Sequence, residues 1–303
     1  MMKTVVPDYY KKFKCLAEKC RHNCCIGWEI DIDEDTYSLY SQIGGDFGQR
    51  LKNGINHTNI PCFRLDKDER CLFLNKDGLC DIISTLGDGA LCDICNDHPR
   101  FKNFYSDRTE IGLGLCCEEA CKIILENTKK VKLVALEDDN DDLLTDEEAS
   151  FINSRNIIFE ILQDKSLPYL DREQKVLATY GIKTNTLAPE CWADIYWNLE
   201  RLDKNWEKYL GFLRNAKDFS YDSAFDNVYQ NLCIYFVYRH LAASLDDELF
   251  TKRLAFCLHA VMIIAAIFEN ADEDSKDIFE ICRMYSAEIE YSDENISRLL
   301  NFC

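Results

Sequence analysis

Residues 254–268 read LAFCLHAVMIIAAIF, the most apolar run in this chain of 303 residues. The run lies between Arg253 and Glu269 and is 15 residues long. This is too short for a helix that crosses a bilayer, and it suits a helix buried in a protein core. The run therefore predicts a central helix of an α-helical domain.

Segments on both sides of this run also have a helical pattern. Apolar residues recur at spacings of three and four over 149–163, 190–214, 222–245, 249–270 and 275–290. In the third segment the following residues lie on one broad side of the predicted helix: Phe225, Val228, Tyr229, Leu232, Tyr235, Phe236 and Arg239. We therefore predict that the second half of the chain is all-α.

A strongly acidic stretch precedes the first of these segments. Eight of the 12 residues from Glu137 to Glu148 are acidic, which favours a solvated connector. Thr145 and Glu148 have the spacing of a capping box at a helix start. The sequence thus predicts a cysteine-rich domain at 1–130, an acidic connector at 131–148 and a helical domain at 149–303. The fold class is mainly α, and the N-terminal region is irregular with little strand.

Cysteines dominate the N-terminal region. Of the 17 cysteines, 12 lie at or before Cys121, and the first four have the spacing C-x4-C-x3-C-C from Cys15 to Cys25. The start MMKTVVPDYYKKF has no apolar run of the kind in signal peptides, so we expect a cytoplasmic protein with reduced thiols. Thiolate-rich sites bind zinc or iron–sulfur clusters. Residues 29–33 alternate as an extended segment does.

The spacing bears on the kind of metal. Only Cys92 and Cys95 form the C-x2-C pair that zinc knuckles use. The adjacent pair Cys24–Cys25 favours two different metal atoms, since neighbouring side chains diverge. The third cysteine of the C-x3-C-x2-C motif of radical S-adenosylmethionine enzymes is absent at that spacing, which excludes this class. An iron–sulfur cluster, with 4Fe-4S first, and zinc both stay open.

Charge is unevenly distributed along the chain. Residues 1–130 carry a net charge of −3 and residues 131–303 carry −16. This balance disfavours binding to nucleic acid or to anionic membrane. It fits plain solubility, and it also fits a basic partner such as a lysine-bearing protein.

The cysteine pattern resembles that of a known family. The stretch Phe13-x-Cys15-x4-Cys20-x3-Cys24-Cys25-x2-Trp28 is similar to the opening of the flagellin lysine-N-methylase family. This family belongs to a group with CxxCxxCC-type zinc/iron-chelating domains. Further similar stretches follow in order: Cys71–Asn75, Gly78–Cys80, Leu86-Gly87, Cys95 with Pro99-Arg100, Cys117–Leu125 and Tyr235–His240.

The resemblance implies a set of metal ligands. Its eight cysteines fall on Cys15, Cys20, Cys24, Cys25, Cys71, Cys80, Cys95 and Cys117. Four others are extra to the pattern, namely Cys62, Cys92, Cys116 and Cys121. Glu118 stands where the family usually has proline. The metal group is either structural or a binding point for the amino-acid end of the cosubstrate.

The resemblance also implies methyl transfer from S-adenosylmethionine to lysine side chains, with flagellin as the leading substrate. This displacement needs an uncharged amine, whereas a free lysine has a pKa of about 10.4. Gly112-x-Gly114 lacks the third glycine of a dinucleotide-binding loop. The catalytic candidates are Tyr235, Tyr238, Arg239 and Asp31, and a buried structural network is the alternative for the first three. The competing function is a non-enzymatic protein that chelates or senses metal and has a helical interaction domain.

Overall fold

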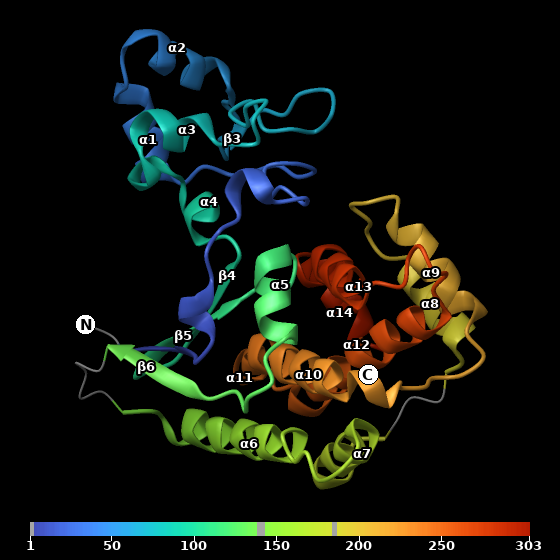
Figure 1. The fold of residues 1–303 in the computed structure, drawn as a ribbon. Helices are drawn as coiled ribbons and strands as arrows, with labels where there is room; N and C mark the ends of the chain where they lie inside the picture. Colours follow the sequence, from blue (N-terminus) through green and yellow to red (C-terminus); the bar gives the residue numbers. More distant parts are fainter. Residues whose placement is uncertain (1–2, 138–142, 184–186) are drawn as a thin grey trace. The chain divides into compact units, whose positions relative to one another are not determined.

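The computed structural model describes residues 3–137, 143–183 and 187–303 (Figure 1). It forms two compact units, which we call the cysteine unit, residues 14–100, and the helical unit, residues 3–13 and 101–303. The predicted cysteine-rich domain 1–130 is therefore divided: residues 14–100 form the cysteine unit, and residues 3–13 and 101–130 belong to the helical unit. The predicted connector 131–148 starts with a strand of the helical unit, and its residues 138–142 lie outside the described part of the chain.

A sheet explains why the first residues belong to the helical unit. The strands β1 (Lys3–Pro7), β4 (Arg100–Phe104), β5 (Arg108–Leu113) and β6 (Leu133–Glu137) form it in the order β4-β5-β1-β6. β1 is parallel to β5, with Lys3 opposite Arg108, and antiparallel to β6, with Pro7 opposite Leu133. The N-terminal strand therefore pairs with segments that follow the cysteine unit.

The rest of the helical unit is α-helical, which confirms the predicted fold class. Its helices are α5 (Glu118–Leu125), α6 (Asp146–Leu162), α7 (Tyr169–Tyr180), α8 (Pro189–Trp197), α9 (Trp206–Asn215), α10 (Asp226–His240), α11 (Ser244–Asp247), α12 (Phe250–Asn270), α13 (Ile278–Tyr285) and α14 (Asp293–Leu299). The predicted capping box begins α6: Thr145 accepts from the Glu148 amide, and the Glu148 carboxylate accepts from the Thr145 amide at 2.9 Å.

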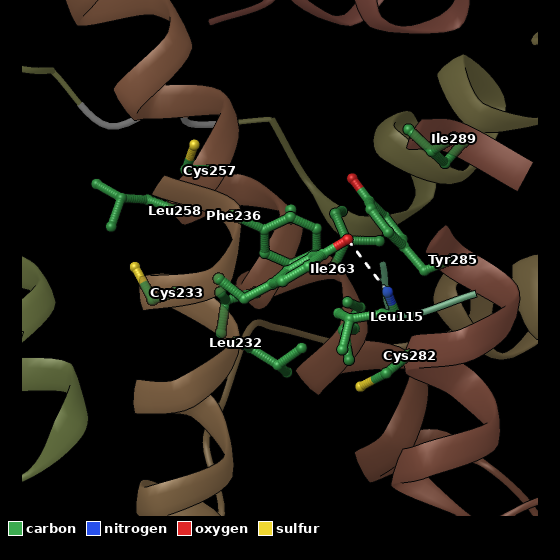
Figure 2. Packing of buried hydrophobic residues seen from close by; sticks show 14 of the residues in the cluster. Leu115, Leu232, Cys233, Phe236, Cys257, Leu258, Ile263, Cys282, Tyr285 and Ile289 are labelled. Carbon is green, nitrogen blue, oxygen red and sulfur yellow. Dashed lines mark hydrogen bonds between the residues drawn. The ribbon is translucent and has the colours of Figure 1, made fainter. Parts of the chain in front are cut away.

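The run at 254–268 forms a buried helix, as predicted. α12 packs against α10 and α13, and Figure 2 shows Phe236 of α10, Ile263 of α12 and Tyr285 of α13 in this core. α10 is also buried on every side from Tyr229 to Tyr238, beyond the single apolar side that its pattern predicts. Within the described residues α12 is the one helix long and apolar enough to span a membrane, and 72% of its apolar window is buried in the unit.

Two other predicted helical segments differ in detail. The segment 190–214 forms α8 and α9, separated by a loop whose Leu202 and Asp203 amides donate to the Glu288 carboxylate at 2.9 and 2.7 Å. This distant carboxylate replaces the helical hydrogen bonds. The segment 275–290 forms α13 followed by a π-helical turn, Ser286–Glu290. α7 and α14 have no counterpart in the sequence prediction.

The cysteine unit is small and irregular. Its elements are α1 (Glu34–Gln42), α2 (Gly45–Asn53), β2 (Ile55–Asn56), β3 (Cys62–Phe63), α3 (Asp81–Leu86) and α4 (Asp93–Asp97). Its core holds 11 buried residues. Ile30 and Ile32 are buried while Glu29 and Asp31 are exposed, which confirms the alternation of the extended segment. Such a small core contributes little burial to the stability of the unit.

A buried carboxyl group in α7 makes the helical unit sensitive to pH. Glu173 is 7% exposed, and burial raises its pKa from 4.5 to about 7, against the opposing effect of the Tyr221 hydroxyl. The folded state therefore binds this proton more tightly than the unfolded chain. Its contribution to stability is complete below pH 4.5 and is lost as the pH rises through 7. The loss amounts to about 3 kcal/mol.

We expect Glu173→Gln to remove this pH dependence. Urea unfolding of the helical unit, measured from pH 4.5 to 8, will show the wild type losing about 3 kcal/mol relative to the variant. Glu160→Gln, an exposed change on α6, serves as the control and will follow the wild type. Parallel pH curves for the wild type and Glu173→Gln would contradict the assignment.

Candidate active site and cysteine cluster

A pocket of about 580 Å³ opens in the helical unit. It lies between β4, the end of α10, the start of α12 and α14, and Phe101, Arg239, His240 and Glu290 are among its lining residues. A volume of this size suits a small-molecule or side-chain ligand. The π-helical turn ends at Glu290 and brings its side chain to the pocket, and such turns are frequent at functional sites.

Glu290 is the centre of a buried hydrogen-bond network. Its Oε2 accepts from the Tyr235 hydroxyl at 2.7 Å and lies 3.0 Å from Arg239 Nε and 2.8 Å from His240 Nε2. The Tyr235 hydroxyl in turn accepts from Arg239 Nη1 at 2.9 Å and from the Leu115 amide at 3.2 Å. The network thus holds the charged groups of α10 and the π-helical turn in one fixed arrangement.

The charge states of this network follow from burial and pairing. Burial acts to raise the pKa of Glu290, but the charge of Arg239 and the hydrogen bonds from His240 and Tyr235 outweigh it and hold the pKa below its usual value. Burial lowers the pKa of His240. At neutral pH Glu290 is therefore a carboxylate and His240 is an uncharged imidazole that donates its Nε2–H to it.

The second oxygen of this carboxylate is different. Glu290 Oε1 is buried and has no hydrogen-bond partner within the part of the chain that the structure describes. Arg239 is further held by aromatic rings, with its guanidinium 5.2 Å from the centre of the Phe101 ring and 4.6 Å from that of Tyr291. A buried carboxylate with one unused acceptor thus belongs to a residue that lines the pocket.

The four catalytic candidates from the sequence have different surroundings. Tyr235 and Arg239 lie together in the network. Tyr238 donates to the Ile111 carbonyl at 3.4 Å, and its ring lies 5.6 Å from the Arg155 guanidinium, away from the pocket lining. Asp31 lies exposed in the cysteine unit. Glu290 is not among the sequence candidates. Its signal in the sequence is that Glu288 and Glu290 lie on either side of Ile289 in a segment predicted to be helical.

The cysteine unit brings several of its thiols together. Six of them lie close enough together to shift one another's pKa values: Cys24, Cys25, Cys71, Cys80, Cys92 and Cys95. The Cys71 amide donates to the Cys25 carbonyl at 2.8 Å and so ties the two segments together. Trp28 donates to the Cys24 carbonyl at 2.8 Å and packs on the same small core. Five of the eight predicted ligands are in this cluster, and Cys92, which the resemblance leaves out, is there as well.

Backbone amides point at these sulfurs. Phe73 and Leu74 donate to Cys71, Ile82 and Ile83 donate to Cys80, and the Cys95 amide donates to Cys92. Such N–H···S bonds stabilise a thiolate and are common around thiolate-bound metals.

Hydrogen bonds between neighbouring thiols shift their pKa values. The bond from Cys25 lowers the pKa of Cys24 to about 7, and the bond from Cys95 lowers the pKa of Cys92.

A polar side chain supports this cluster from α1. Asp33 caps α1 by accepting from the Thr36 amide at 2.8 Å, and its other oxygen accepts from the Asp93 amide at 2.9 Å, next to Cys92. Asp33 thus connects the start of α1 to the backbone next to Cys92.

The other predicted ligands lie elsewhere. Cys15 is exposed, the Cys20 thiol donates to the His22 carbonyl at 3.2 Å, and Cys117 belongs to the helical unit at the start of α5. Among the described residues, no three or more Cys, His, Asp or Glu side chains stand in a metal-binding arrangement.

Comparison with known proteins gives the pocket a family context. Residues 110–303 match the family described as "FliB lysine N-methylase C-terminal domain". A "Lysine-N-methylase" of Salmonella typhimurium is 29% identical over 138 residues, which cover 42% of this chain and 33% of the relative. "Flagellar biosynthetic protein FliU" of Salmonella muenchen is 28% identical over 138 residues, which cover 42% of this chain and 79% of the relative.

The chain thus matches about a third of the length of the lysine-N-methylase relative. No solved structure matches it significantly. The region that matches the family, 110–303, contains Tyr235, Arg239, His240 and Glu290 and ends with the chain. The network at the pocket therefore lies inside the family domain.

Proposed function

The chain belongs to the lysine N-methylase family, and from this premise we propose that it is a protein-lysine N-methyltransferase that uses S-adenosylmethionine. Membership confirms the resemblance drawn from the sequence. Flagellin is the leading substrate, since the curated relatives carry the names of a lysine-N-methylase and of a flagellar biosynthetic protein. The observation that carries the proposal is the buried Arg239–Glu290–His240 network at a pocket within the family domain.

The reaction is a displacement at carbon. The lysine nitrogen forms a bond to the methyl carbon with its lone pair, and the bond from that carbon to sulfur breaks. The electron pair leaves on sulfur, which becomes a neutral thioether, and the methylated nitrogen then loses its extra proton to solvent. The protein accelerates such a step chiefly by holding the two reactants in line and excluding water.

We further propose that the cysteine unit holds a thiolate-bound metal group, with a 4Fe-4S cluster first and zinc second. The donor set fits, since sulfur ligands select these groups and backbone amides already point at three of the sulfurs. Cys24, Cys25, Cys71, Cys80 and Cys95 would hold it, with Cys92 as a further candidate. When bound, the group cross-links segments that have little core of their own.

The predicted location and partners follow from the same proposal. A cytoplasmic enzyme would meet flagellin before export, and the charge of −16 over residues 131–303 suits a substrate that presents lysines. Nucleic acid and anionic membrane stay outside the proposed partners for the same electrostatic reason.

One assay tests the proposal. The full chain is purified anaerobically, incubated with methyl-labelled S-adenosylmethionine and flagellin from the source organism, and the flagellin is examined for methylated lysines by mass spectrometry. We expect label on lysine nitrogens and none when the flagellin lysines have been acetylated beforehand. A metal-loaded protein that neither binds S-adenosylmethionine nor transfers label would instead be the non-enzymatic metal-binding protein.

A further inference from the structure

The two oxygens of Glu290 have unequal surroundings. Three donors converge on Oε2, whereas Oε1 has none among the described residues although the side chain is 0% exposed. A buried acceptor without a donor is unfavourable. A ligand that brings an N–H group to Oε1 would complete the network.

The charges around the pocket decide which form of ligand is favoured. Glu290 is already neutralised by Arg239, at 3.0 Å, and an arginine cannot lose its charge. A second cation beside this pair would leave a buried net positive charge, which is strongly disfavoured. A neutral N–H donor satisfies Oε1 without adding charge.

The other charged side chains of the pocket act in the same direction. Arg253 neutralises Asp247 at 2.5 Å, and Asp293, at the start of α14, is the remaining carboxylate. Lys102 and Lys252 also line the pocket. With His240 uncharged, the lining carries four positive and three negative groups, so it offers no excess negative charge to a cation.

Other titratable groups around Glu290 keep their charge state near neutral pH. The side chains in question are Cys116 ahead of α5, Cys257 of α12, Cys282 and Tyr285 of α13, and Tyr291 after the π-helical turn. Burial raises the pKa of each of them, so all five stay protonated. They give no compensating negative charge to the site.

We infer that this pocket is the acceptor-lysine site and that Glu290 Oε1 takes an N–H of the lysine amine in its uncharged form. The inference rests on the proposed function and gives it a residue. Arg239 disfavours the ammonium form, so that the amine enters or stays deprotonated. With one N–H held by Glu290, the nitrogen lone pair is left to form the bond to the methyl carbon. Selection of the uncharged amine removes the need for a separate strong base.

The test measures binding of a lysine mimic to the full metal-loaded chain without any methyl donor. The probe is Nα-acetyl-L-lysine methylamide, titrated by calorimetry or by ligand-observed NMR between pH 7 and 9. The uncharged fraction of a lysine amine rises about tenfold per pH unit in this range. We therefore expect the affinity to rise about tenfold per unit, since Glu290 and His240 both have lowered pKa values and do not titrate there. A flat pH profile would overturn the inference.

Two control ligands separate the amine from its side chain. The analogue with a methyl group in place of the amine is expected to show no pH dependence and weaker binding at pH 9. The trimethyl-lysine analogue is always charged and is expected to bind weakly at every pH. Equal binding of either analogue and the probe at pH 9 would show that the amine is not what the pocket recognises.

A matched pair of variants locates the site. Glu290→Gln is expected to weaken probe binding at pH 9 by about tenfold or more, the effect of losing a charge-assisted hydrogen bond. Glu294→Gln makes the same change at an exposed position of α14, outside the pocket lining, and is expected to bind as the wild type does. Equal affinity in both variants would remove Glu290 from the site. Should Glu290→Gln fail to fold, the pH profile of the wild type decides alone.

The outcome is separable from that of the methyl-transfer assay. Amine binding with the expected profile but no transfer of label would leave the pocket in place and remove the proposed function. Transfer of label with a flat binding profile would keep the function and remove the pocket.

Discussion

If the cysteine unit holds the proposed thiolate-bound metal group, replacement of Cys71 by serine will release it and unfold residues 14–100. Cys71 is buried, it interacts with Cys80 and Cys92, and its amide connects it to Cys25. A structural thiolate site contributes about 10–16 kcal/mol of apparent binding free energy. This is comparable to the whole stability of a typical domain, which is about 5–15 kcal/mol. A unit with 11 buried core residues has little to offset such a loss.

Metal analysis and hydrogen exchange measure the two parts of this result. The variant, purified anaerobically, will have less metal per chain, and amides in residues 14–100 will exchange fast while those of the helical unit stay protected. Cys191→Ser, at an exposed position of α8, is the control and will keep both metal and protection. Unchanged metal content together with unchanged exchange would remove Cys71 from the ligand set.

The second large effect is expected at a buried ion pair in the helical unit. Arg155 of α6 is 1% exposed and donates to both oxygens of Glu110 of β5, at 2.5 and 2.9 Å. Arg155→Met leaves the carboxylate of Glu110 buried without its partner. Breaking such a pair costs about 3–5 kcal/mol. The midpoint of urea unfolding of the helical unit will fall accordingly.

The double variant makes this prediction specific. Arg155→Met combined with Glu110→Leu removes both charges and will recover most of the lost stability, because apolar groups of similar size often replace a buried pair without loss. Lys208→Met is the control, because Lys208 of α9 pairs with Asp272 at 3.4 Å where both side chains are about half exposed, and its loss will cost under 1 kcal/mol. If Arg155→Met and the double variant were equally destabilised, loss of packing would be the cause.

Local sequence patterns predict most of the long helices correctly, but they do not predict features that depend on contacts between residues far apart in the sequence. The run at 254–268 and the Thr145 capping box are local features, and both are confirmed. The sequence also contains start and stop signals for α7: Pro168 precedes the helix, and Gly181 ends it in the left-handed conformation. The break between α8 and α9 depends on Glu288, which binds the Leu202 and Asp203 amides and lies more than 80 residues after them in the sequence.

The candidate site was predictable in part for the same reason. Tyr235 and Arg239 are four residues apart on one helix, so their proximity follows from helical spacing. Glu290 reaches them only through the packing of the π-helical turn, 51 residues after Arg239. The pairing of β1 could not be predicted from local sequence either, because its partners β5 and β6 come after the cysteine unit in the sequence.

The position of β1 sets an order of events during synthesis. Its partners begin at Arg108 and Leu133, so on a ribosome that adds about 5–20 residues per second β1 waits on the order of 5–25 s for them. All of residues 14–100, with their thiols, emerge within that interval. The proposed metal group can therefore be inserted into the nascent chain before the sheet closes and before the helices that line the pocket are made.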